Sequence, residues 1–242
     1  MTRSTYLRYE VVRNFRNWRF LFLSLAFPLV LYFAVGSSNQ HALFNGIAFT
    51  LYFMAAMATL GTMASLVSSA AVIAADRSTG WIRQMRITPL TFGTYFGARV
   101  LNGYLRALLT IVVLCLAGTA LGVRLSATQW LTMVGLLLVG LIPFAVLGIL
   151  LGHLLKADSS AVAMAGIVTL FALLGGVYGF QIATSGAMFQ VIKAIPSYWL
   201  VQAGKTALGH GGWPAEGWIV VAAWTVVLTA LTVVVYQRDT RR

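Results

Sequence analysis

Charged side chains are scarce in this sequence of 242 residues. Only 9% of the residues are Asp, Glu, Lys or Arg, whereas 60% are hydrophobic, and an ordinary soluble domain carries about 25% charged residues. The chain holds five acidic residues in all, which makes an active site built on paired carboxylates implausible. The composition indicates an integral membrane protein, because this number of charged residues is too small to cover the surface of a water-soluble globule.

The sequence has little cysteine and no complete nucleotide-binding motif. Cys115 is the single cysteine, which excludes an intrachain disulfide and a thiolate metal cluster. The three histidines are far apart in the sequence, so we expect no metal site. Gly204, Lys205 and Thr206 match only the tail of a phosphate-binding loop, because Trp199 occupies the position of the required first glycine. We therefore expect no cofactor bound by this chain and no intrinsic enzymatic activity.

Long apolar runs make up most of the chain. Residues 20–75 contain no Asp, Glu, Lys or Arg, and one span needs about 20 residues, so this stretch holds two spans joined by a polar turn at 36–41. The pattern predicts an all-α integral membrane protein, with six transmembrane helices in a single transmembrane domain, residues 1–242. The predicted spans are residues 20–35, 44–74, 100–121, 130–151, 161–180 and 218–236.

The basic residues are distributed unevenly over the two sides of this six-span arrangement. Thirteen of the 17 Lys and Arg residues fall on the side that carries both termini. The positive-inside rule places that side in the cytoplasm. The net charge of +12 therefore reflects topology, and we expect no nucleic-acid partner. A cleaved signal peptide is disfavoured, because the basic region before the first span is 19 residues long.

Residues 5–19 are predicted to form a separate amphipathic helix. Leu7, Val11, Phe15 and Trp18 recur at helical spacing on one face, and the arginines lie mostly off that face. Such a helix lies flat in the cytoplasmic interface, in contact with membrane lipid. The alternative is a charged leader that only orients the first span. The interfacial-helix prediction rests on Glu10, Arg13, Phe15 and Arg16.

The segment 76–90 after the second span is too polar to span a membrane and too patterned to be a linker. Trp81, Ile82 and Met85 give a short apolar ridge that arginines flank, and Pro89 ends any helix. A short cytoplasmic helix of this kind fits a docking element for a protein partner. An elbow that lies along the membrane between two spans fits the residues equally well.

Residues 181–216 are expected on the outer side. Their apolar pieces are too hydrophobic for a free loop and too short to span. Half-membrane or interfacial helices, broken at Pro196, are the better prediction. The aromatic residues of this region suit the outer headgroup belt.

Arg106 is the one cation inside a predicted span. An intramembrane charge is a candidate functional group. We favour two other interpretations, namely snorkelling to the cytoplasmic interface or a structural pair with Glu10 or Asp76.

Hydroxyl groups recur every three residues in the second span, at Thr59, Thr62 and Ser65, with Met54 and Met57 nearby. They could line a path for an amphipathic substrate. More commonly, such hydroxyls only bond the carbonyl one turn back.

The assembled pattern resembles the permease subunit of type 2 ABC exporters, the group that includes daunorubicin-resistance-type drug permeases. The resemblance covers nearly the whole chain: a basic N-terminal helix, six spans with both ends inside, a long second span and short broken helices before the last span. Its most specific piece is an acid, three residues, Gly and Thr, then a helix that ends in Thr-Pro-Leu. Here that reads Asp76, Gly80 and Thr88-Pro89-Leu90, with Asp76 where Glu is usual and Trp81 where Thr is usual. Residues 194–199 are similar to the outer re-entrant region of the family.

The resemblance implies a multi-pass protein of the bacterial plasma membrane that works as a homodimer. A separate cytoplasmic ABC ATPase subunit would bind the ATP and Mg. The implied function is ATP-driven export of a small hydrophobic or amphipathic compound (a drug, an antibiotic or a lipid-like molecule), which would pass along faces of the second and fifth spans. The implied ATPase-coupling residues are Asp76, Arg77, Gly80, Trp81, Ile82, Arg83, Met85, Arg86, Thr88 and Pro89. The implied substrate path comprises Met54, Met57, Thr59, Thr62, Ser65, Thr169 and Tyr178.

Two other functions stay open from the sequence. A non-transporting membrane scaffold or immunity component would also lack catalytic residues. A stand-alone secondary transporter usually needs acids or histidines near the membrane midplane, and none of the five acids lies in the middle of a predicted span. An ABC ATPase recovered with the chain in equal amount would support export.

Overall fold

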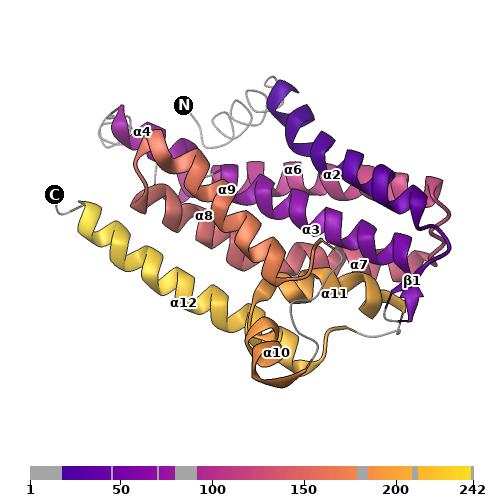
Figure 1. The fold of residues 1–242 in the computed structure, drawn as a ribbon. Coiled ribbons are helices and arrows are strands. Elements are labelled where there is room, and N and C mark those ends of the chain that lie inside the picture. The colour runs from indigo at the N-terminus through magenta and orange to yellow at the C-terminus, as the bar shows by residue number, and fades with distance from the viewer. Residues whose placement is uncertain are drawn as a thin grey trace.

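The computed structural model describes residues 18–44, 46–69, 71–79, 92–178, 185–208 and 212–240. Within these ranges the chain is almost entirely helical (Figure 1). The elements are α2 (Trp18–Ser38), β1 (Leu43–Phe44), β2 (Ile47–Ala48), α3 (Phe49–Ser69), α4 (Ala71–Ser78), α6 (Phe92–Ala120), α7 (Ala127–Gly140), α8 (Ile142–Leu154), α9 (Ala157–Leu174), α10 (Gly186–Lys193), α11 (Pro196–Leu208) and α12 (Ala215–Thr240).

The described residues contain five helical stretches that are long and apolar enough to cross a membrane. α2 contributes a shorter apolar helix, Leu25–Ser38. The prediction of an all-α membrane protein is therefore confirmed, and the number of six transmembrane helices stays a prediction. The five stretches are Phe49–Ser78, Gly93–Ala120, Ala127–Leu154, Ala157–Leu174 and Ala215–Gln237.

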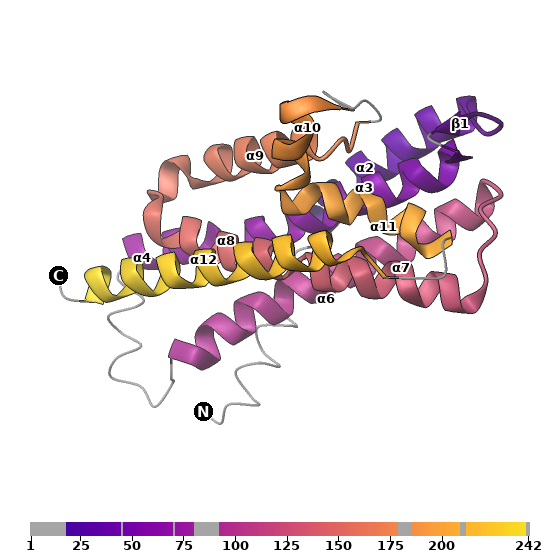
Figure 2. The same cartoon turned by 90° about the horizontal axis from the view of Figure 1, so that it is seen from below.

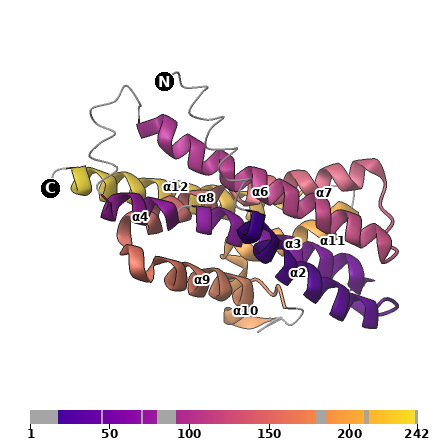
Figure 3. The ribbon, with the colours of Figure 1, turned by 90° about the horizontal axis from the view of Figure 1, so that it is seen from above.

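α3 is the central helix of the bundle. It packs against α2, α6, α8, α9 and α11, and nearly all of its side chains are buried. Small residues allow this close packing, because a Cβ atom on Gly61 would lie 2.7 Å from the Thr110 side chain of α6. Figures 2 and 3 show α3 in the middle of the bundle, with α12 and α9 on its flanks.

The second span begins later than the sequence analysis expects. We predicted a helix from residue 44, but α3 begins at Phe49. The preceding residues form a small antiparallel pair, with Leu43 opposite Ala48 and Phe44 opposite Ile47. Gly46 adopts a φ of 81° at the turn, a conformation that glycine adopts without steric cost. The N–H of Phe49 donates to the carbonyl of Ala42 at 2.9 Å, where α3 begins.

The third and fourth spans also differ from the prediction. α6 begins at Phe92, eight residues before the expected start at 100, so Arg106 lies 14 residues from each end of the helix. The fourth span is divided into α7 and α8 at Leu141. Pro143 lies two residues later, and proline has no N–H to continue the hydrogen-bond ladder. The fifth span ends at Leu174 rather than 180, before Gly176 with its φ of 77°.

α10 and α11 form two short helices before the last span. α11 begins at Pro196, a favourable first helical residue because its missing N–H is not needed there. Gly204 of α11 lies against α3, where an added Cβ would be 2.8 Å from the Cβ of Ala55. Ser197 Oγ donates to the carbonyl of Phe171 at 2.6 Å. α11 is therefore packed into the helix bundle rather than held in a free loop.

Candidate functional site

The carboxylate of Asp76 fastens α4 to the beginning of α6. Arg99 Nη2 lies 2.9 Å from Asp76 Oδ2, and the Tyr95 hydroxyl donates to the same oxygen at 2.5 Å. The Arg99 guanidinium also lies 5.0 Å from the centre of the Tyr95 ring, within the range of a cation–π contact. Arg99 is buried, with its side chain 6% exposed. These three residues are called the Asp76 clamp below.

A second set of contacts extends the Asp76 clamp to α8 and α12. Arg77 Nη1 donates to the carbonyl of His153, near the end of α8. The rings of Phe96, His153 and Tyr236 meet pairwise, with centroids 5.4 to 6.0 Å apart. α4, the beginning of α6, the end of α8 and the end of α12 thus form one connected cluster at the end of the molecule where α4 and the C-terminus lie (Figure 1).

The Asp76 clamp lies at the two ends of the predicted coupling segment. Asp76 and Arg77 are its first two residues, and Tyr95 and Arg99 follow its last residue, Leu90, by five and nine positions. The other residues assigned to coupling lie outside the described residues, as do those of the predicted interfacial helix. The former are Gly80, Trp81, Ile82, Arg83, Met85, Arg86, Thr88 and Pro89, and the latter are Glu10, Arg13, Phe15 and Arg16.

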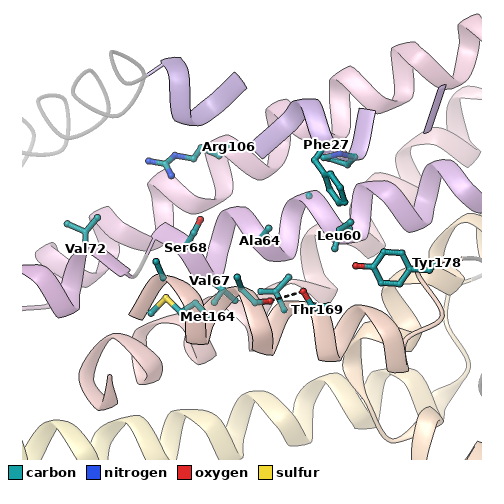
Figure 4. Close-up of a pocket in the computed structure, with 15 residues that line it drawn as sticks. Phe27, Leu60, Ala64, Val67, Ser68, Val72, Arg106, Met164, Thr169 and Tyr178 are labelled. Atoms are coloured by element: carbon teal, nitrogen blue, oxygen red, sulfur yellow. Dashed lines mark hydrogen bonds between the residues drawn. The ribbon is translucent and has the colours of Figure 1, made fainter. Parts of the chain in front are cut away.

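A cavity of about 590 Å³ opens between α2, α3, α4, α6 and α9. α3 and α4 contribute one helical face of mainly small or apolar residues, and α9 contributes another. Figure 4 shows Arg106 and Ser68 toward the Val72 end of the cavity, and Leu60 and Tyr178 toward the other end. The lining residues are Phe27, Pro28, Leu60, Gly61, Ala64, Val67, Ser68, Val72, Arg106, Ala161, Met164, Ala165, Val168, Thr169 and Tyr178.

Arg106 lines this cavity from α6. At 1.5 Å per residue it lies about 21 Å along the axis from either end of that helix. Asp76, one of the two partners suggested for Arg106, pairs with Arg99 instead, which lies two helical turns earlier on the same face. The other suggested partner, Glu10, lies outside the described residues.

The residues predicted to line a substrate path divide into two groups. Thr169 and Tyr178 line the cavity, and their role stays a prediction. Met54, Met57, Thr59, Thr62 and Ser65 are all packed inside the bundle, with at most 1% of each residue exposed, so a path along them is not formed in this structure.

Local hydrogen bonds explain the arrangement of the hydroxyls. Thr59, Thr62 and Ser65 each donate to the carbonyl four residues earlier, at 2.6 to 2.8 Å. Of the two interpretations given for these hydroxyls, the structure contains the local one, in which each hydroxyl bonds the carbonyl one turn back. The face of α3 that lines the cavity is one step around the helix, at Leu60, Gly61, Ala64, Val67 and Ser68.

Sequence reasoning missed Tyr95 and Arg99. The signal available was the seven-residue interval between Arg99 and Arg106, which places both on one face of a helix, and the single acid near them in the chain, Asp76. Among the described residues, no three His, Cys, Asp or Glu side chains gather in a way that could hold a metal ion.

Comparison with known proteins agrees with this architecture. Residues 36–236 match the family model described as ABC-2 family transporter protein. The chain is also similar to a protein of Bacillus subtilis (strain 168) named "Putative transport permease YvfS", with 28% identity over 208 residues, which are 85% of this chain and 84% of that protein. The family match spans most of the chain, including α3, α4, α6 and α9, which line the cavity, and only the last three residues of α2. The chain therefore belongs to the ABC-2 family of transporter proteins.

Proposed function

We propose that this chain is the membrane-spanning subunit of an ATP-driven exporter, and that a separate cytoplasmic ATPase subunit supplies the energy. Membership of the ABC-2 family supports the proposal, because permeases of this family generally work with a partner ATPase. ATP and Mg bind to that partner, and this chain binds no cofactor and catalyses no reaction of its own.

The Asp76 clamp is the observation that carries the proposal. The segment between Thr79 and Phe92 connects the end of α4 to the beginning of α6. These two helix ends contact each other, and they also contact α8 and α12. We assign this segment as the coupling helix to which the ATPase subunit binds. A force applied to Trp81, Ile82 or Met85 would then act on four helices together rather than on one flexible loop.

The compound exported is small and hydrophobic or amphipathic, such as a drug, an antibiotic or a lipid-like molecule. The volume of the cavity, about 590 Å³, lies within the range of pockets for drug-sized ligands. Multidrug export and a contribution to antibiotic resistance follow as proposals from this size and apolar lining.

Two copies of the chain would form the complete permease, in the bacterial plasma membrane and in contact with its lipids. Both termini would be cytoplasmic. The excess of basic residues on the side of the termini supports this orientation.

Affinity purification of the tagged chain from its own host membranes tests the proposal. We expect an ABC ATPase in equal amount. The substitutions Trp81→Glu and Met85→Glu should reduce the ATPase activity of the complex while membrane insertion is unchanged, because a charge on the apolar ridge disfavours docking in an apolar groove. Trp81→Phe and Met85→Leu are the matched controls and should retain activity.

The outcomes separate the rival functions. Purification without any ATPase would favour the scaffold or immunity component. Transport in vesicles that depends on an ion gradient and not on ATP would favour a secondary transporter.

A further inference from the structure

The cavity between α2, α3, α4, α6 and α9 is open on one side. Among the described residues, α2 packs on α3 and α6, and α9 packs on α3, α4, α8 and α11, so the two helices flank one face of α3 without forming a packed pair. Phe27 of α2 is 58% exposed, and Ala161, Ala165 and Thr169 of α9 are exposed as well, although all four line the cavity. These residues belong to apolar helices, so the opening faces the hydrocarbon of the membrane.

The walls of the cavity consist mainly of small and apolar side chains. α3 contributes Gly61 and Ala64, and α9 contributes Ala161 and Ala165. The hydroxyl of Thr169 donates to the carbonyl of Ala165 at 2.9 Å, within α9 itself. A buried water molecule needs about two to four polar partners, and an empty cavity forfeits the dispersion contacts of its lining. Hydrocarbon is therefore the favoured filling of this part of the cavity.

The cavity covers the depth of one leaflet. Leu60, at one end, is separated from Phe49, where α3 begins, by about 16 Å along the helix axis. Half of the hydrocarbon core measures about 15 Å, so Leu60 lies near the midplane when Phe49 is at the outer boundary. From there the wall follows α3 and α4 to Val72, which is about 18 Å further along the axis. A hydrocarbon chain of the cytoplasmic leaflet extends over the same depth.

The cross-section of the cavity admits a chain and excludes a helix. A volume of about 590 Å³ over a length of about 18 Å corresponds to a mean cross-section of about 33 Å². A helix with its side chains is about 10 to 12 Å across, which is a cross-section of at least about 80 Å². A helix of a second copy or of another protein can therefore cover the opening but cannot occupy the cavity, whereas an extended hydrocarbon chain can.

We propose that the cavity takes up one hydrocarbon chain of a membrane amphiphile, which enters sideways from the cytoplasmic leaflet through the opening between α2 and α9. The polar end of the molecule lies toward Val72, where Ser68 and Arg106 line the cavity (Figure 4), and the end of the chain lies toward Leu60. The inference rests on the proposed transport function and orientation and deepens them, because it names the class of compound and its route of entry. Selection acts on the shape of the chain and not on the charge of the headgroup.

Photochemical labelling tests the site. The purified full chain is placed in nanodiscs of phosphatidylcholine that contain a small fraction of a phosphatidylcholine with a diazirine near the end of one chain. After irradiation, mass spectrometry of proteolytic fragments identifies the labelled residues. We expect adducts on Leu60 and Val67, which are buried but line the cavity. Leu66, which is also buried in α3 but lies outside the cavity lining, is the matched control and should carry none.

Variants of α9 locate the chain within the cavity. Ala165→Phe places a ring in the cavity and should reduce the adducts on the α3 wall by about fivefold or more, which is the equivalent of the smallest usual overpacking penalty. Ala161→Leu, a milder change of the same wall, should act in the same direction. Val162→Phe adds the same ring at a position of α9 that is 79% exposed and outside the cavity lining, so it should label as the wild type does. Adducts on the exposed face of α12 should be equal in all variants, which verifies that each is inserted.

Three results would overturn the proposal. Labelling of α12 without adducts on Leu60 or Val67 would mean that the opening is covered, by a second copy of the chain or by another protein. Equal labelling of the α3 wall in Ala165→Phe and in the wild type would place the chain outside the cavity. Labelling by a lysophosphatidylcholine with the same diazirine chain, but not by the two-chain probe, would mean that the cavity is entered from its cytoplasmic end and not sideways from the bilayer.

Failure of the site and failure of the transport function give different results. An ATPase that copurifies with a chain whose cavity residues carry no adducts would remove the hydrocarbon site and leave the exporter. Adducts on the cavity residues of a chain that recovers no ATPase would leave the site and remove the exporter.

Discussion

The Asp76→Asn substitution should strongly destabilise the end of the bundle where α4 meets α6. Arg99 has 6% of its side chain exposed and Asp76 has 19%, so the pair is largely removed from water. Loss of one partner of a buried ion pair costs about 3 to 5 kcal/mol, because the other charge is left uncompensated. Asparagine keeps one oxygen acceptor and the site is partly wet, so we expect a loss near the lower limit, about 3 kcal/mol.

A double-mutant cycle separates the ion pair from other effects of the substitution. Asp76→Asn, Arg99→Gln and the double variant are unfolded with SDS in mixed micelles, and tryptophan fluorescence reports the transition from the seven tryptophans of the chain. The double variant should lose less than the sum of the single variants, since it buries no unpaired charge. Tyr95→Phe, which deletes the 2.5 Å hydrogen bond to Asp76, should cost about 1 kcal/mol.

A matched control is available at the other end of the molecule. Lys193 and Glu216 form an ion pair at 3.1 Å, but the Glu216 side chain is 65% exposed. Glu216→Gln should therefore cost less than about 1 kcal/mol. If Asp76→Asn cost no more than Glu216→Gln, or if the double-mutant cycle gave no coupling energy, the Asp76 clamp would not be a stabilising element and the reasoning would fail.

Three further predictions concern packing, hydrogen bonding and topology. Gly204→Ala should lower the unfolding free energy by about 1 to 3 kcal/mol, because its Cβ would lie 2.8 Å from that of Ala55. The control Gly135→Ala has open space around the new Cβ and should be neutral or slightly stabilising. Equal effects of the two substitutions would contradict the close approach of α11 to α3. Tyr52→Phe removes the 2.6 Å bond from the Tyr52 hydroxyl to the carbonyl of Gly176 and should cost about 1 kcal/mol in the same SDS titration; no change would mean that this contact between α3 and the end of α9 is not stabilising. In a Cys115→Ala background, a membrane-impermeant maleimide should label Ser185→Cys in intact cells and Ser78→Cys only after permeabilisation; the reverse pattern would invert the proposed orientation.

The sequence predicts the membrane helices well, because a run of apolar residues without charge has no other stable solution in lipid. It predicts their ends poorly. α6 extends back to Phe92 through Tyr95 and Arg99, which are polar and would be placed outside a span by hydropathy alone. In the structure, Tyr95 and Arg99 both contact the carboxylate of Asp76, and Phe96 beside them lies against the rings of His153 in α8 and Tyr236 in α12. Such tertiary contacts leave no periodic signal.

The sequence also predicts only part of the candidate site. Arg106 could be singled out from the sequence, since a cation in an apolar run is conspicuous. The cavity wall could not, because Ala64, Ala161 and Ala165 are ordinary residues of a membrane helix and become a wall only when α2 and α9 stand apart over one face of α3. The polar residues of α3 attract attention in the sequence, yet their hydroxyls are satisfied within the helix itself.

Two indole rings complete the hydrogen bonding of the turn between α10 and α11. Trp199 Nε1 donates to the carbonyl of Lys193 at 2.8 Å, and Trp224 Nε1 donates to the carbonyl of Ala194 at 2.7 Å. These carbonyls belong to a helix terminus, where water normally supplies the missing donors. Because the protein itself supplies these donors, the two carbonyls stay hydrogen-bonded when the turn is in contact with acyl chains instead of water. A thicker or thinner bilayer would then shift the position of this turn relative to the headgroups without unravelling it.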